Sequence, residues 1–245
     1  MATLLQGRGA GAAGERDAAA REGTHSAAMV QIAQGSLRMG STEGSRDERP
    51  VHDVAVAASF EMDVTEVTAA AYQRCVDGRG CEAPVNGPFC TFGKRGKENH
   101  PINCVSWDDA DAFCRWVGKR LPSEEEWEHA ARGPEGRKYP WGDAPPDGRV
   151  CWRRWMSKLG TCEVGSFPSG DSPFHVHDMS GNVWEWTSTV HSPGYDRPHH
   201  GALRVHRRGG WGDVNPSDFR AADRGRARPA DRYDVVGFRC ARSAR

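Results

Sequence analysis

The chain has 245 residues, of which 37% are hydrophobic, with 29 glycines, 15 prolines and nine tryptophans. This composition argues against a helical bundle or a doubly wound sheet and favours a loop-rich α+β domain. Basic and acidic residues both number 33, so no global charge directs the chain to nucleic acid, and no nucleic-acid partner is expected.

The first 27 residues form a polar run of alanine, glycine, glutamate and arginine. This run predicts a disordered segment ahead of one folded domain over residues 28–245. It lacks the charged n-region and apolar h-region of a signal peptide. No stretch of the chain approaches the roughly 20 apolar residues that a membrane helix needs, so no membrane span is expected.

The folded part begins with a strand pattern. Residues 30–39 alternate apolar and polar side chains around a glycine, which predicts a β-hairpin. Residues 52–60 continue the alternation and predict further strand. The apolar residues of that first stretch are Val30, Ile32, Leu37 and Met39.

Three helices are predicted next. Apolar residues at helical spacing place the first over residues 66–76. A capping-box pattern at residues 106–109 opens the second, which Gly118 ends, and the same pattern at residues 123–126 opens the third. Beyond Gly133 the short apolar patches between turn residues predict loops and short strands.

Eight cysteines form an even set, which favours disulfides and an extracytoplasmic, oxidising compartment (periplasmic, lipoprotein-like or secreted), although no signal peptide is visible. A zinc site is the alternative, because four thiolates would satisfy tetrahedral Zn²⁺. The wide, irregular spacings without a CxxC pair favour disulfides.

Seven motifs follow one another between Met29 and Cys240: GSLRMGS, SFEMDVTEVTAAAY, HPINCVSWDDADAFCRWVGKRLPSEEEWEHAARG, YPWGD, DMSGNVWEWT, RRGGW and GFRC. In this order they resemble the formylglycine-generating enzymes, also called sulfatase-modifying factors. The resemblance implies the sulfatase-modifying-factor variant of the C-type lectin fold. That fold is α+β, with few helices, short antiparallel strands and much irregular loop structure.

The enzymes of that family oxidise a substrate cysteine with O₂, using a cysteine pair just after the RGGS/RGGW turn. The matching stretch here, Gly210 to Arg220, has no cysteine, so it lacks the soft thiolates that would hold Cu(I), and copper is not expected. We therefore expect a non-oxidase binding or accessory module. The alternative is an oxidoreductase acting on a cysteine of a protein substrate with O₂, as in sulfatase maturation.

A second branch of the superfamily uses non-haem iron held by a histidine-rich motif on a separate helical domain, and no such motif occurs here. His175 and His177, with Asp178 adjacent, form a conceivable metal site. The alternative interpretation is two loop histidines beside a turn.

The stretch after RRGGW is where domains of this fold vary their ligand contacts, so the resemblance implies a recognition surface there. The expected ligand is a protein or peptide, or a small polar or anionic molecule, bound by a monomer. The arginines and aspartates interleaved in this stretch could be acid/base partners in a cleft, but an ion-pair network that orders the irregular loops is the favoured interpretation. The expected surface consists of Trp211, Asp213, Asn215, Asp218, Arg220 and Arg224.

The DMSGNVWEWT motif offers an oxygen-only ligand set of the kind that suits Ca²⁺. Asp178 and Glu185 would supply carboxylates, while Gly181 and Val183 would supply backbone carbonyls. The resemblance implies a structural calcium at these four positions. The alternative is a carboxylate-capped turn without metal.

The resemblance also divides the cysteines. It implies a disulfide between Cys114 and Cys240, while Cys151 and Cys162 bracket a replaced loop and are expected to form a local disulfide. A second family disulfide would join the positions held here by Ala131 and about Ala221, so both of its halves are missing together. Three pairings stay open for the remaining cysteines, Cys75, Cys81, Cys90 and Cys104.

Overall fold

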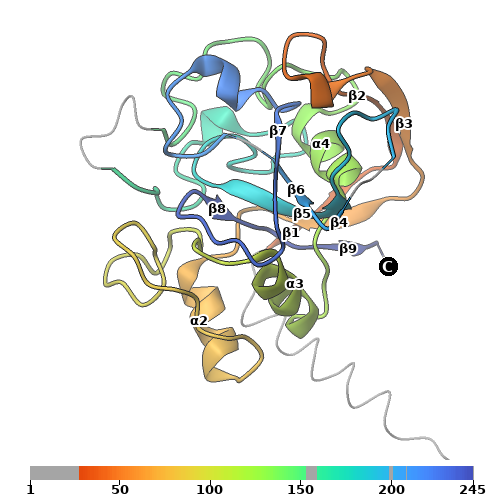
Figure 1. Cartoon of the computed structure of the whole chain (residues 1–245). Helices are drawn as coiled ribbons and strands as arrows, with labels where there is room; N and C mark the ends of the chain where they lie inside the picture. Colours follow the sequence, from red (N-terminus) through yellow and green to blue (C-terminus); the bar gives the residue numbers. More distant parts are fainter. Residues whose placement is uncertain (1–27, 153–158, 199–200, 208, 245) are drawn as a thin grey trace, which may run out of the picture.

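A computed structural model describes residues 28–152, 159–198, 201–207 and 209–244 (Figure 1). The N-terminal segment expected to be disordered, residues 1–27, lies outside them. Within the described residues the regular structure is sparse, and long irregular loops connect three α-helices and nine short strands. This arrangement is the α+β class that the composition predicted.

The strands form three small sheets. One has the order β1-β4-β9, a second pairs β2 with β3, and the third has the order β7-β6-β5-β8. All pairs are antiparallel except β5 with β8, which is parallel. The strand bounds are β1 Met29–Ile32, β2 Gly35–Met39, β3 His52–Val56, β4 Phe60–Asp63, β5 Trp184–Val190, β6 Arg204–Arg207, β7 Arg224–Ala227, β8 Val236–Gly237 and β9 Ala241–Ser243.

The hairpin predicted over residues 30–39 is wrong, although both of its strands exist. Ile32 in β1 pairs with Phe60 in β4, whereas Leu37 in β2 pairs with Val54 in β3. The strand predicted over residues 52–60 is likewise divided between β3 and β4. Alternation within a strand records which face is buried and carries no information about the partner, so the chain could change sheets without altering the pattern.

The helices begin where side chains satisfy their free N–H groups. The Thr68 hydroxyl accepts from the N–H of Ala71 at 3.1 Å, so the first helix starts later than predicted. Ser106 and Ser123 each form the capping box predicted for them, with a carboxylate three residues on. The helix bounds are α2 Ala69–Asp77, α3 Trp107–Trp116 and α4 Glu124–Arg132.

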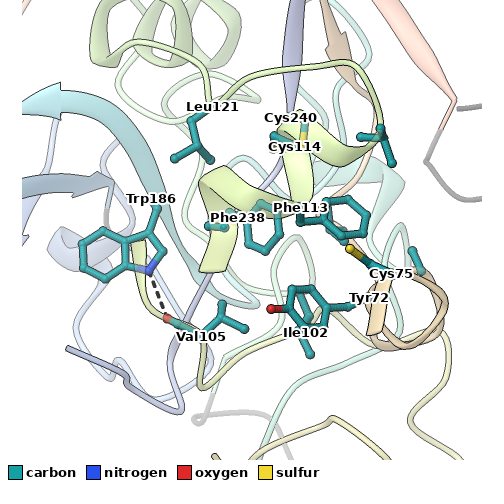
Figure 2. Close-up of a cluster of buried hydrophobic side chains, with 14 of the residues drawn as sticks. Tyr72, Cys75, Ile102, Val105, Phe113, Cys114, Leu121, Trp186, Phe238 and Cys240 are labelled. Atoms are coloured by element: carbon teal, nitrogen blue, oxygen red, sulfur yellow. Dashed lines mark hydrogen bonds between the residues drawn. A yellow bond between two sulfur atoms is a disulfide. The ribbon is translucent and has the colours of Figure 1, made fainter. Parts of the chain in front are cut away.

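The largest buried cluster joins α2 and α3 to strand β5 and the segment before β9 (Figure 2). The ring of Phe113 lies 5.7 Å from that of Tyr72 and 5.5 Å from that of Phe238. Trp186 is buried and donates from its indole nitrogen to the Val105 carbonyl at 3.2 Å. The cluster ties the C-terminal motif to the helices that lie more than a hundred residues earlier.

A second buried cluster packs α4 against β1 and β4 through Trp127, Ile32 and Phe60. Figure 1 shows α2 and α3 on one side of the strands and α4 on the other. Among the described residues, none of the helices has the length and apolar character to cross a membrane.

Candidate functional site

The turn that follows β6, residues 209–218, is held in place by hydrogen bonds to the Asp213 side chain. One oxygen of its carboxylate accepts from the indole nitrogen of Trp184 at 2.7 Å and from the N–H of Gly210 at 2.8 Å. A Cβ at position 210 would lie 2.9 Å from a ring carbon of Trp184, so only glycine lets the chain pass this close. The backbone here is therefore held rigidly against β5.

Trp211 anchors the same turn from its inner side. It is buried, its N–H donates to the Asn182 carbonyl at 2.7 Å, and its indole nitrogen donates to the Asp234 carbonyl at 3.0 Å. Its ring lies 5.2 Å from that of Phe89. Trp211 is therefore a buried support of the turn, and little of its side chain is accessible to a ligand.

The outer face of the turn is open to solvent. Asn215 is exposed, and its backbone and side-chain nitrogens both donate to Asp218 at 3.2 Å, where the short 3₁₀ helix η4 (Pro216–Phe219) begins. Val214 beside them is 51% exposed, and Phe89, whose ring packs on Trp211, is partly exposed as well. The turn therefore offers two polar residues next to exposed apolar side chains.

Arg220 and Arg224, the other two residues expected on this surface, are instead buried in ion pairs. Arg220 makes a two-pronged contact with Glu48 at 2.7 and 2.9 Å, and Arg224 makes one with Glu124 at 2.8 and 2.7 Å. For these two arginines the ion-pair interpretation is the correct one. The positions of Arg220 and Arg224 in the sequence could not show whether each arginine contacts a ligand or forms a buried ion pair.

The DMSGNVWEWT segment forms a tight buried turn before and into β5. Asp178 has a positive φ of 54° and accepts from the N–H of Gly165 at 2.6 Å. Burial raises the pKa of its carboxyl group, although the Gly165 hydrogen bond and the charge of Arg239 oppose the rise. Gly181 has a φ of 91°, and a Cβ there would lie 2.7 Å from that of Val150.

Glu185 is satisfied within the protein. Its two oxygens accept from the guanidinium of Arg239, both at 2.7 Å, and one also accepts from the indole nitrogen of Trp127 at 2.8 Å. Glu185 and Arg239 are both fully buried. The arginine of the GFRC motif thus neutralises the glutamate of the WEWT motif.

Glu66 is a buried carboxyl group that the sequence analysis missed. It is completely buried, and neither of its side-chain oxygens has a hydrogen-bond partner. Burial raises its pKa well above the usual value, and the charges of Asp178 and Glu185 raise it further against the opposing charge of Arg239. It lies in the EVT sequence, which the helical periodicity had assigned to the first helix.

In this region carboxyl groups outnumber guanidinium groups. Three carboxyl groups interact with one guanidinium, so their ionised forms leave uncompensated negative charge. Among the described residues, no three histidines, cysteines, aspartates or glutamates are arranged to hold one metal together. A cation here would therefore depend on Asp178 with the backbone carbonyls of Gly181 and Val183, because Glu185 is engaged by Arg239.

The two loop histidines do not converge. His175 is exposed, whereas the Nδ1 atom of His177 lies 2.6 Å from a carboxylate oxygen of Asp171. The interpretation of two loop histidines beside a turn fits this placement.

All eight cysteines lie in disulfides. The expected pairs Cys114–Cys240 and Cys151–Cys162 are present. The pairing that the sequence left open is Cys75 with Cys81 and Cys90 with Cys104. Ala131 and Ala221 are both fully buried in one hydrophobic cluster, so the positions of the missing family disulfide are filled by packing.

Comparison with known proteins places these features in a family. Residues 14–244 match the model of the sulfatase-modifying factor enzyme 1-like domain. The chain is 40% identical over 174 residues to the formylglycine-generating enzyme of Streptomyces coelicolor, covering 61% of this chain and 54% of that protein. It is 31% identical to the inactive C-alpha-formylglycine-generating enzyme 2 of Bos taurus, covering 88% of each chain.

Among solved structures, PvdO from Pseudomonas aeruginosa superposes with a TM-score of 0.78 at 28% identity, covering 91% of this chain and 97% of that one. The chain spans about half or less of the length of several curated relatives, including 54% of the Streptomyces enzyme. These similarities establish the fold that the motifs implied.

Proposed function

Because the chain belongs to the sulfatase-modifying factor family, with a formylglycine-generating-enzyme-like domain, we propose that it is a non-oxidase member that acts as a binding or accessory module. The observation that carries the proposal is that no cysteine is free to bind copper. Every cysteine is held in a disulfide, and the segment from Gly210 to Arg220 contains none. Cu(I) would need soft thiolate ligands, and the aspartates and asparagine of that turn are hard oxygen donors.

The similarity to a relative named as inactive supports this proposal, and the similarity to the Streptomyces enzyme supports the alternative of an oxidoreductase acting on a protein cysteine. A copper and oxygen assay separates the two. We expect no stoichiometric Cu(I) binding, no O₂ uptake and no aldehyde when the protein is incubated with a cysteine-containing sulfatase peptide. Aldehyde formation that depends on bound Cu(I) would overturn the proposal in favour of the oxidoreductase.

The recognition surface is proposed to be the outer face of the turn, with Val214, Asn215 and Asp218, together with Phe89, whose ring packs on Trp211 of the same turn. Rigid backbone under exposed polar and apolar side chains suits a protein or peptide ligand, because little ordering is needed on binding. The buried pairs of Arg220 and Arg224 hold the segment in place behind it.

Selection of peptides displayed on phage tests whether this surface binds a peptide. Peptides enriched on the wild type should lose binding when Val214 is changed to Asp, and should keep it with Val85→Asp, a similarly exposed valine elsewhere in the sequence. Equal binding to both variants would show that the turn is not the recognition surface.

We propose further that a structural Ca²⁺ ion is held at the DMSGNVWEWT turn, with Asp178 as its main carboxylate. The excess of carboxyl groups over guanidinium groups around Arg239 supports this. The ion would supply positive charge only, and the protein residues would position the turn.

Removing calcium is then expected to lower the melting temperature. With free Ca²⁺ about a hundredfold above its Kd, EDTA should lower Tm by roughly 5–10 °C. The Asp178→Ala variant should lose the response to EDTA. Thermal melts with and without EDTA measure both effects, and an unchanged Tm for the wild type would remove calcium from the site.

The four disulfides also support a proposed extracytoplasmic location, since such bonds persist in oxidising compartments. Thiol counting on unfolded, unreduced protein isolated from its source checks this point. Eight free thiols would contradict it.

A further inference from the structure

One hollow lies beside β7, the edge strand of the largest sheet, and a second adjoins it; none of the residues of the turn at 209–218 lines either one. Their volumes are about 650 and 730 Å³. Both are lined by Arg46 and Pro193, so they join into one groove. Each hollow is of a size that holds a small ligand.

This basic groove is defined by four exposed arginines: Arg46, Arg49, Arg197 and Arg226. Of these four arginines, only Arg226 has a carboxylate oxygen of a described residue within ion-pair distance, that of Asp47 at 3.6 Å. The groove is lined by two acidic residues, Asp47 and Asp196. Four exposed positive charges therefore face two negative ones, in a chain whose net charge is zero.

The floor of the groove is rigid. Arg224 reaches from β7 to the backbone carbonyls of Asp47 and Ser192 at 2.8 and 3.2 Å, and its charge is neutralised by Glu124. His191 lies 3.3 Å from the Asp47 carboxylate. Burial works against the ionisation of Asp47, but the hydrogen bond with His191 and the charge of Arg224 outweigh it and lower its pKa.

We propose that the basic groove binds a small molecule that carries two or more phosphate groups, with one anionic group in each hollow. The planar fork of a guanidinium matches phosphate oxygens in two-pronged hydrogen bonds. Arg46 lies between the hollows and contacts both groups, while Arg226 serves one hollow and Arg197 the other. A ligand with a single charge would leave the second hollow without a counter-ion.

Isothermal titration with inorganic tripolyphosphate and with orthophosphate, at about 150 mM salt, tests the proposal. We expect one-to-one binding of tripolyphosphate, at least tenfold tighter than that of orthophosphate. The Arg46→Gln variant should weaken tripolyphosphate binding by about tenfold or more, because it loses a charged hydrogen-bond donor to both groups. The Arg197→Gln and Arg226→Gln variants should each weaken it by a smaller factor.

Arg115 supplies the matched control, because its side chain is 74% exposed and lies on α3 outside the groove. The Arg115→Gln variant should bind tripolyphosphate as the wild type does. The proposal is overturned if the wild type does not bind, if Arg115→Gln weakens binding as much as Arg46→Gln, or if orthophosphate binds as tightly as tripolyphosphate. All four substitutions change exposed side chains, so each variant should fold.

Discussion

Replacing both Cys114 and Cys240 with alanine is expected to lower the free energy of unfolding by about 5 kcal/mol. The two residues are 126 positions apart, and chain-entropy models give the largest stabilisation to the longest closed loops. Since domains are commonly stable by about 5–15 kcal/mol, the loss would remove roughly a third or more of that stability. Urea denaturation without reductant measures the change.

The Cys75–Cys81 disulfide provides the control, because its partners are only six positions apart and one of them is also fully buried. The same double replacement to alanine there is expected to cost about 2 kcal/mol by the same relation. A clear difference between the two double variants supports the loop-length account. Equal losses would contradict it and assign the stabilisation to local packing of the sulfur atoms.

The sequence predicted the parts of the fold that short-range rules control. The capping boxes at Ser106 and Ser123 depend on residues three positions apart, so pattern and structure agree there. Strand pairing failed because Ile32 meets Phe60 rather than its near neighbours. That choice depends on which faces are buried together in the finished domain, and a strand pattern does not record it.

The candidate site was predictable where the family resemblance supplied long-range information, as it did for Cys114 with Cys240. It was not predictable where charges pair across the fold. Arg220 pairs with Glu48, 172 positions earlier, and nothing in the residues around either one distinguishes a buried pair from an exposed ligand surface. Glu66 was missed for the same reason, since the charged residues that act on its carboxyl group, Asp178, Glu185 and Arg239, are all distant in sequence.

A single substitution inside the buried charge network is expected to have the second large effect. The carboxylates of Glu124 and Glu128 on α4 are held by the guanidiniums of Arg207 on β6, Arg224 on β7 and Arg132 on α4. Arg207 lies at the centre, fully buried, 2.7 Å from Glu124 and 2.9 Å from Glu128. It therefore joins both carboxylates and ties the helix to the sheet.

The Arg207→Met variant should lower the free energy of unfolding by about 3–5 kcal/mol, because Glu124 and Glu128 each lose a buried charged hydrogen-bond partner and keep only Arg224 and Arg132. The matched control is Arg226→Met on neighbouring β7, whose side chain is 54% exposed and whose nearest carboxylate is 3.6 Å away; it should cost no more than about 1 kcal/mol. Urea unfolding of the two variants compares them directly. Equal losses in the two variants would contradict the account, because an exposed arginine with one distant carboxylate would then matter as much as the buried one that joins helix and sheet.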